Sequence, residues 1–201
     1  MMSPAAAFPA DIAIVGGGAS GVLLAALLVR KSALRVVLIE RGSTTALGVA
    51  YSTHCRGHLL NVRASDMSAL DEEPDHFAQW VARDGSGLGR NDFVPRADYG
   101  RYLQDLLADS VRRSEGRLRI VTGDVTAIRE QAAGVAIEID GHGPLPARTA
   151  VLATGHRPPS ADSGAYRGNP WREDAIEGLA PDASILLIGT NPRWEAPLVN
   201  A

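Results

Sequence analysis

The sequence contains a single cysteine, Cys55, and a single lysine, Lys31. One cysteine cannot form a disulfide within the chain, which agrees with a reducing compartment. The other basic residues are arginines, a bias that we attribute to genomic composition rather than to phosphate binding. The net charge is −3, so the chain has no general attraction for nucleic acid or for an anionic membrane.

A long hydrophobic run is also lacking. The longest apolar stretch, residues 22–29, is far shorter than the roughly 20 residues that cross a bilayer. The first residues, MMSPAAAFPAD, lack the basic region that begins a secretory signal. We therefore expect a cytoplasmic protein. Its 45% hydrophobic and 21% charged residues are typical of a globular domain, and 201 residues can bury a sizeable core.

The N-terminal segment DIAIVGGGASGVLLAALLVRKSALRVVLIE has the pattern of a βαβ unit. Residues 12–15 and 36–39 are short apolar runs rich in branched side chains, which is typical of buried parallel strands. Residues 19–31 lie between them and are strong helix formers with leucines on one face. The segment therefore predicts a strand, a crossover helix and a second strand in a parallel sheet.

Gly16, Gly18 and Gly21 follow the first strand with the spacing G-x-G-x-x-G. In such a turn the first glycine permits the bend, the second lets the backbone approach a pyrophosphate, and the third lets the helix pack closely. The helix that begins at Ala19 then directs its N–H groups and positive end toward the phosphates. Glu40 ends the second strand, where a carboxylate can accept hydrogen bonds from a ribose. We predict a dinucleotide site, for which FAD and NAD are both open because both use this fingerprint.

Residues 41–68 form a long stretch with little regular periodicity. Its content of leucine, valine and tyrosine argues against disorder, and long irregular loops in compact domains are usually functional. A loop of this size could wrap an extended cofactor such as FAD.

The remaining pattern predicts two helices and a small antiparallel insertion. Residues 74–83 and 99–113 are expected to be helical, the second with Asp98 as its N-cap, and their aromatic stripes are interpreted as core. Residues 119–128 predict a strand that is interrupted at Gly123 and Asp124. Residues 135–139 and 149–153, on either side of a DGHG turn, complete a β-meander.

The motifs GVAYST, HLLNVRASDMS, FAQW, FVPRADYGRYL and VLATGHRPP together resemble the bacterial FAD-NAD(P)-binding oxidoreductase family. That family is similar to the N-hydroxylating and flavin-containing monooxygenases and includes FAD-dependent urate hydroxylase-like proteins. The resemblance covers residues 11–190 and implies an α/β, Rossmann-like FAD-binding domain, a parallel sheet with a β-meander insertion. It implies an FAD-dependent, NAD(P)H-linked oxidoreductase of monooxygenase-like type that acts on a small-molecule substrate, with no nucleic acid and no membrane as partner.

The resemblance also implies the roles of single residues. It places the Gly16–Gly21 turn on the FAD pyrophosphate, Glu40 on the ribose, the backbone near Val125 on the adenine, and residues 48–68 along the flavin. The turn at Thr154 and Gly155 resembles the segment that links the FAD and NAD(P) domains, and a plain strand-to-linker turn is the alternative. The expected cofactor-binding residues are Gly16, Gly18, Ala19, Ser20, Gly21, Glu40, Arg41, Asn61, Val125, Thr154 and Gly155.

No protein side chain is assigned to catalysis, because the flavin would carry the redox chemistry. His54, Cys55 and His58 are close in sequence but lack a second cluster at ligand spacing, so we expect no metal site.

The sequence divides into three expected regions: an FAD-binding domain at 11–157, a Gly/Pro-rich linker at 158–183, and the first strand of an NAD(P)-binding domain at 184–201. Where a second glycine-rich turn and helix would follow Gly189, Pro192 and Pro197 oppose a helix. The residues that remain are too few for a βαβ unit of roughly 30 residues. We therefore expect a truncated second domain, with a frameshift as a hypothesis for its origin.

Three interpretations of function follow from this expectation. The first is an FAD-dependent oxidoreductase represented by its N-terminal FAD part, with NAD(P)H as the second cofactor of the full-length family. The second is an FAD- or nucleotide-binding fragment with no turnover of its own, and the third is a short NAD-binding dehydrogenase. The sequence indicates neither the substrate nor the oligomeric state.

Overall fold

The structure is a computed structural model that describes residues 10–155, 178–180, 182–184 and 186. Its N-terminal part is the predicted βαβ unit: strand β1 (Ala10–Val15), helix α1 (Ala19–Lys31) and strand β2 (Val36–Glu40). β1 and β2 are parallel neighbours, and Val36–Ile39 of β2 is completely buried, as the run of branched apolar residues predicted.

The sheet has six strands in the order β3-β2-β1-β6-β5-β4. Strands β3 (Leu118–Thr122) and β6 (Leu145–Leu152) continue the parallel part on either side of the βαβ unit. Strands β5 (Gly134–Ile139) and β4 (Val125–Gln131) are antiparallel and form the predicted meander with the first half of β6. β6 begins earlier than the sequence predicted, because residues 145–147 pair with β5 before the strand continues along β1.

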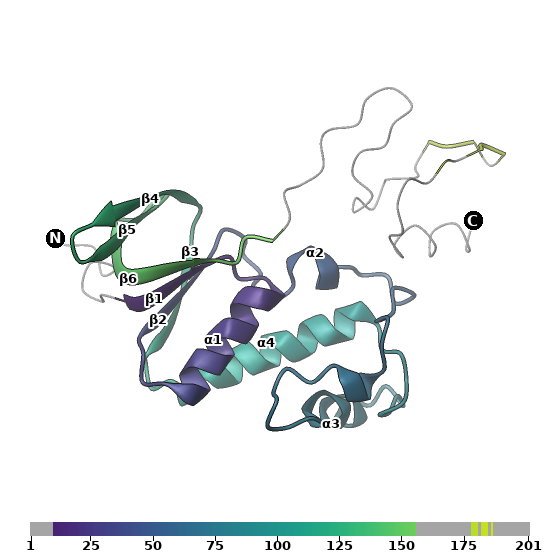
Figure 1. Cartoon of the computed structure of the whole chain (residues 1–201). Helices are drawn as coiled ribbons and strands as arrows, with labels where there is room; N and C mark the ends of the chain where they lie inside the picture. The colour runs from purple at the N-terminus through teal and green to yellow at the C-terminus, as the bar shows by residue number, and fades with distance from the viewer. Residues whose placement is uncertain (1–9, 156–177, 181, 185, 187–201) are drawn as a thin grey trace.

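The two edge strands β3 and β4 are joined by only two residues, Gly123 and Asp124. So short a link requires the two edges of the sheet to lie close together, and the meander therefore folds back over one face of the parallel strands. Figure 1 shows β4 and β5 on the side of β1 and β2 opposite to α1 and α4. The predicted interruption at these two residues is confirmed.

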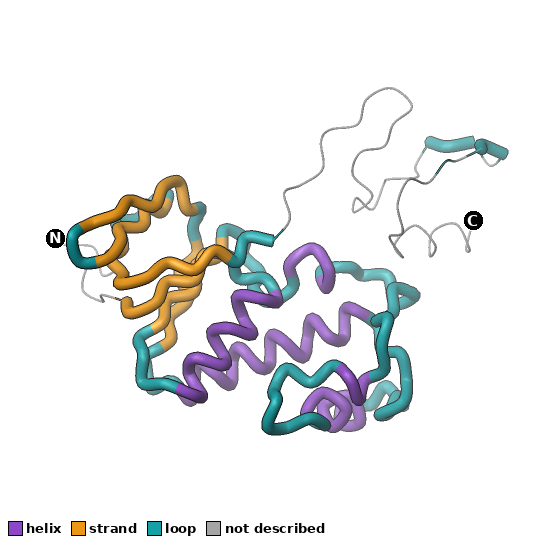
Figure 2. Tube along the Cα trace, viewed as in Figure 1, coloured by secondary structure: helices purple, strands orange, loops and turns teal. Residues whose placement is uncertain are grey.

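Each face of the parallel strands has its own core. On one face, Ile14, Val36 and Leu38 pack against α1 and α4 (Arg96–Arg113). On the other face, alternate residues of the same strands pack against the meander, whose main contributions are Ile137 and Leu145. Figure 2 shows the helices gathered beside the strands in a separate layer. The arrangement is a three-layer α/β fold of Rossmann type.

Residues 41–95 connect β2 to α4 and contain three short helices. These are α2 (Gly48–Tyr51), the 3₁₀ helix η2 (Ala64–Asp66) and α3 (His76–Arg83). Phe77 on α3 and Tyr102 on α4 are almost completely buried and their rings lie 4.9 Å apart, so the aromatic stripes belong to the core as interpreted.

The prediction that Asp98 caps α4 is wrong. The helix begins at Arg96. Its N-cap residue is Pro95, whose ring fixes φ near the value found at helix starts. Asp98 lies in the first turn, 2% exposed, and forms ion pairs with Arg56 at 3.2 Å and with Arg101 at 2.9 Å. Its carboxylate joins the loop before η2 to α4 and makes no capping hydrogen bond.

The predicted linker at 158–183 and the strand expected from residue 184 onward fall almost entirely outside the described residues. Among the residues that the structure does describe, no helix is both long enough and apolar enough to cross a membrane.

Candidate dinucleotide-binding site

The carboxyl ends of the parallel strands meet at one edge of the sheet. Val15 at the end of β1 lies beside Ile39 of β2 on one side and beside Leu152 of β6 on the other. Glu40 of β2 in turn lies beside Thr122 of β3. The glycine-rich turn, the Glu40 side chain and the Thr154–Gly155 turn therefore begin at neighbouring points, which is where ligands bind in open α/β sheets.

Gly16 makes the bend after β1 and must be glycine for two reasons. Its φ is +110°, a conformation that side chains rarely adopt, and a Cβ there would overlap the carbonyl group of Ala153. The Gly16 amide donates to the Ile39 carbonyl at 2.8 Å, and the Ala153 amide donates to the Val15 carbonyl at 2.8 Å. The glycine-rich turn and the segment that leads to Thr154 are thus in direct contact.

Gly21 has a purely internal role. A Cβ on Gly21 would overlap the carbonyl oxygen of Gly16 and lie 3.3 Å from Leu38, so only glycine lets α1 lie this close to the turn and to β2. Gly18 differs, because a Cβ there would meet only the Cα of Gly48 at 3.6 Å, an ordinary contact, and its φ of −71° suits any residue. Protein packing therefore accounts for Gly16 and Gly21 but not for Gly18.

The carboxylate of Glu40 is held in a fixed orientation by backbone amides. One oxygen, Oε2, accepts from the Gly17 amide at 2.7 Å, and the other, Oε1, accepts from the Gly42 amide at 2.9 Å. Each carboxylate oxygen can accept two hydrogen bonds, so both keep capacity for a hydroxyl donor. The side chain is only partly buried, which leaves this capacity accessible.

The first turn of α1 begins beside this carboxylate. Gly18 is its N-cap residue and has no side chain that could accept from the first amides, and the residues that follow, Ala19 and Ser20, are not acidic. Arg30 and Lys31 lie in the last turn, where basic residues suit the negative end of the helix dipole. The first turn of α1 therefore contains no acidic residue of its own, and its positive end faces the edge of the sheet beside Glu40.

The remaining predicted site residues are distributed as follows. Val125 begins β4 two residues after Gly123, whose amide donates to the Glu40 carbonyl at 2.9 Å, so the structure brings Val125 to the same edge. Thr154 and Gly155 are exposed at that edge, and Gly155 has a φ of +69°. Arg41 follows Glu40 and is exposed.

Asn61 follows a segment that pairs with the residues just before α4. The amide of Leu60 donates to the Val94 carbonyl at 2.9 Å, and Leu59 forms an antiparallel bridge with Pro95. Asn61 is exposed there, and no hydrogen bond among the described residues links its side chain to the glycine-rich turn. Its role in cofactor binding stays a prediction.

Sequence reasoning missed Gly17 and Ala46, and it gave Gly48 only as the start of the range expected along the flavin. A Cβ on Gly17 would lie 2.8 Å from the Cβ of Glu40, so this glycine gives the Glu40 side chain its place. Ala46 donates from its amide to the Gly17 carbonyl at 2.6 Å, and Gly48 packs on Gly18. The G-x-G-x-x-G template treats position 17 as free, although the run of three glycines was a visible signal.

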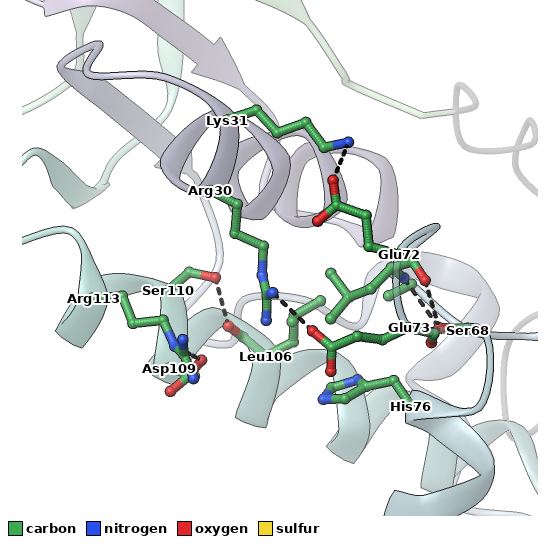
Figure 3. Close-up of polar contacts among 12 residues, drawn as sticks. Arg30, Lys31, Ser68, Glu72, Glu73, His76, Leu106, Asp109, Ser110 and Arg113 are labelled. Atoms are coloured by element: carbon green, nitrogen blue, oxygen red, sulfur yellow. Dashed lines mark hydrogen bonds and ion pairs between the residues drawn. The ribbon is translucent and has the colours of Figure 1, made fainter.

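A groove of about 330 Å³ lies elsewhere, between α1 and residues 68–72. Leu23, Leu24 and Leu27 are among its apolar lining residues, and Arg30, Lys31 and Glu72, which form ion pairs, also line it. Figure 3 shows these pairs, Lys31 with Glu72 at 2.9 Å and Arg30 with Glu73 at 3.0 Å. The groove shares no lining residue with the glycine-rich turn, so it is not part of the dinucleotide site.

Within the described ranges, no group of three His, Cys, Asp or Glu side chains is placed to hold a metal ion. His58, one of the residues weighed as a ligand, lies 2.7 Å from the Thr53 hydroxyl through its Nδ1 atom, and Cys55 is exposed.

Comparison with solved structures gives distant similarities. Thioredoxin reductase of T. acidophilum is 18% identical with a TM-score of 0.46, and 73% of this chain and 36% of that protein are covered. An oxidoreductase from Agrobacterium tumefaciens is 18% identical with a TM-score of 0.46, over 80% of this chain and 41% of that one. OTEMO in complex with FAD and NADP is 17% identical with a TM-score of 0.47, over 77% and 27%. The chain therefore spans less than half the length of each of these proteins.

None of the curated proteins is significantly similar to the chain in sequence. A family model does match, and its description is FAD-NAD(P)-binding. The match covers residues 13–157, from β1 through the glycine-rich turn and the meander to the turn at Thr154 and Gly155. The chain thus belongs to the FAD-NAD(P)-binding family, whose cofactors are FAD and NAD(P).

Proposed function

We propose that this chain binds FAD by its adenosine and pyrophosphate half and forms the FAD-binding part of an NAD(P)H-linked oxidoreductase of monooxygenase-like type, acting on a small-molecule substrate. The observation that carries the proposal is the convergence of three features at one edge of the sheet. These features are the Gly16–Gly21 turn with the start of α1, the oriented carboxylate of Glu40, and the Thr154–Gly155 turn in contact with Gly16.

The residues fit a pyrophosphate and a ribose. Gly18 is glycine although neither its φ nor the packing of the protein requires it, which agrees with a backbone that a phosphate approaches closely. The start of α1 offers backbone N–H groups and the positive end of a helix dipole to an anion. Glu40 has acceptor capacity left on both oxygens for the ribose hydroxyls.

The roles of the chain's own residues follow from this fit. Gly18, Ala19 and Ser20 would bind the pyrophosphate through the backbone, Glu40 would orient the ribose, and the backbone near Val125 would contact the adenine. Bound FAD supplies the two-electron redox chemistry, with NAD(P)H as the hydride source, that amino-acid side chains lack. The protein contributes binding and orientation.

The monooxygenase-like type is supported by the motifs GVAYST, HLLNVRASDMS and VLATGHRPP, which resemble those of flavin-dependent monooxygenases.

The test is a visible absorption spectrum of the purified chain during FAD titration, followed by NADPH under anaerobic conditions and then by oxygen. We expect bound flavin. Bleaching by NADPH, with oxygen consumed in step with NADPH oxidation, would mean that these residues also supply a working nicotinamide site and would contradict the expected truncation. Gly18→Val should abolish FAD binding, and Glu40→Ala should weaken it by about 1–3 kcal/mol, the effect of losing hydrogen bonds to a charged acceptor.

Other outcomes would assign other functions. Bound flavin that NADPH does not bleach would make the chain a flavin-binding module without turnover of its own. Binding of NAD in preference to FAD would favour a short NAD-binding dehydrogenase. A chain that binds neither dinucleotide, or a Gly18→Val variant that binds FAD as well as the wild type, would overturn the pyrophosphate assignment.

A further inference from the structure

The glycine-rich turn faces a second segment of the chain, at α2. The amide of Ala46 donates to the carbonyl of Gly17 at 2.6 Å, and Ala46 is completely buried. Gly48 follows with a φ of +54°, and a Cβ on Gly48 would lie 3.5 Å from the Cα of Gly18 and 3.9 Å from the Ala19 amide. Residues 46–48 thus lie beside the same backbone that would receive the pyrophosphate.

This segment is held in place by α4 rather than by the turn alone. A Cβ on Gly100, in the first half of α4, would lie 2.9 Å from the Tyr51 carbonyl oxygen and 2.7 Å from Leu47. Because the Tyr51 oxygen belongs to the backbone, it can make room only if α2 itself moves. Two further contacts fasten the segment to α4: Gln104 donates to the Thr45 carbonyl at 3.4 Å, and the Tyr51 and Tyr99 rings lie 4.8 Å apart.

Glycine inside a helix has a local cost, which makes Gly100 informative. In a helix interior glycine is destabilising relative to alanine, since it adds backbone freedom to the unfolded chain. Gly100 is not in the left-handed region, so its φ does not require glycine. What glycine provides at this position is the close approach of α2 to α4.

We propose that Gly100 is a positioning residue of the dinucleotide site. It lets α2 lie directly on α4, and α2 in turn holds Ala46 against Gly17 and Gly48 against Gly18, so that residues 46–48 form a second wall beside the pyrophosphate. The part of the inference that concerns the pyrophosphate rests on the proposed function, whereas the link from Gly100 to Ala46 is a property of the chain without any ligand.

The test compares Gly100→Ala with the wild type by two independent readouts. The first is the dissociation constant of FAD, measured by the change in flavin fluorescence. The second is the hydrogen exchange rate of the Ala46 amide without FAD, measured by NMR. Gly143→Ala is the matched control, because a Cβ at Gly143 meets nothing within 4 Å and its φ is not in the left-handed region.

We expect Gly100→Ala to weaken FAD binding by about tenfold, a loss equivalent to about 1.4 kcal/mol. The Ala46 amide should exchange faster and the melting temperature should fall, because the added Cβ displaces α2 from α4. A purely structural role for Gly100 would also lower the melting temperature but would leave the FAD affinity of the folded protein unchanged. Gly143→Ala should match the wild type in both readouts.

If the hydrogen exchange rate of the Ala46 amide is the same in Gly100→Ala as in the wild type, the positioning role of Gly100 is overturned, whether or not the chain binds FAD. Faster exchange at Ala46 with unchanged FAD affinity would overturn the second wall and leave the proposed function intact. If Gly100→Ala does not fold, Gly48→Ala tests the wall directly, and FAD affinity equal to that of the wild type would overturn it. Failure of the wild-type chain to bind any dinucleotide would overturn the proposed function and the wall together, and the exchange readout would still decide the link from Gly100 to Ala46.

Discussion

Gly16, Gly18 and Gly21 lie in one turn, but each is glycine for a different reason. Gly16 needs its positive φ and its contact with Ala153, and Gly21 needs the absence of a Cβ against the Gly16 carbonyl oxygen. Neither condition applies to Gly18, so we attribute the glycine at this position to ligand binding and not to packing. The same substitution at two of these positions should therefore have opposite consequences for stability and for binding.

Gly21→Ala should lower the free energy of unfolding by about 2–3 kcal/mol, because the added methyl group overlaps a backbone oxygen that cannot move alone. Gly18→Ala should leave the free energy of unfolding within about 0.5 kcal/mol of the wild type, since its methyl group meets only an ordinary contact. Chemical denaturation of the two variants without FAD measures both values. Equal destabilisation would contradict the distinction between an inward-facing and an outward-facing glycine.

The sequence signals behind the expected site residues are local. The glycine spacing, the acidic residue at the end of the second strand and the interruption at Gly123 can each be recognised within a few residues. The contact of Gly17 with Glu40 and the contact of Ala46 with Gly17 could not be recognised in this way, since they join residues that come together only when β1, β2 and α2 are assembled.

At the scale of elements, the prediction of strands was accurate and that of helix starts was less so. Apolar runs bounded by Gly and Asp identified the strands, because burial on both faces leaves a continuous apolar pattern. The sequence placed the N-cap of α4 at Asp98, a residue type that commonly caps helices, whereas the helix begins at Arg96, directly after Pro95, and Asp98 forms ion pairs. Helix caps depend on which partner a polar side chain finds in the folded chain.

The packing of α3 on α4 includes a histidine whose titration should affect stability. Nδ1 of His76 lies 2.8 Å from the Tyr102 hydroxyl, and burial lowers the pKa of His76 below its ordinary value of 6.5, an effect that Arg30 reinforces and the nearby Glu73 opposes. The unfolded chain therefore binds the proton first as the pH falls. The contribution of His76 to stability is complete above the unfolded pKa and declines as the pH falls from about 6.5 toward the lower folded pKa.

We expect the free energy of unfolding of the wild type to fall more than that of His76→Asn when the pH is lowered from about 7.5 to about 5.5. Asparagine keeps a polar atom near the Tyr102 hydroxyl but does not titrate. Urea denaturation of both proteins at the two pH values measures the difference. A parallel loss of stability in the wild type and the variant would mean that other groups account for the pH dependence.

At the scale of the whole molecule, the folded-back sheet decides where the site lies. The meander covers one face of the parallel strands and the helices cover the other, so both faces are occupied. At the carboxyl edge, the ends of the strands, the glycine-rich turn and the start of α1 remain accessible together. The groove along α1, among Leu23, Leu27 and residues 68–72, is a second place that could receive a ligand. A ligand could bind at either place, and a binding measurement alone does not distinguish them.

Thermal unfolding with two ligands makes this distinction. At a free FAD concentration of about 100 times the dissociation constant, binding should stabilise the fold by about 2.7 kcal/mol, which for a chain of this size is a rise of about 5–10 °C in melting temperature. ADP has the adenosine and the pyrophosphate without the flavin, and it should raise the melting temperature as well if the glycine-rich turn and Glu40 are the site. In Gly18→Val, neither FAD nor ADP should raise the melting temperature, because the valine side chain occupies the path of the phosphates. In Leu27→Ser, which alters the groove at an exposed position, both ligands should still raise the melting temperature. Stabilisation that is kept in Gly18→Val and lost in Leu27→Ser would place the ligand in the groove.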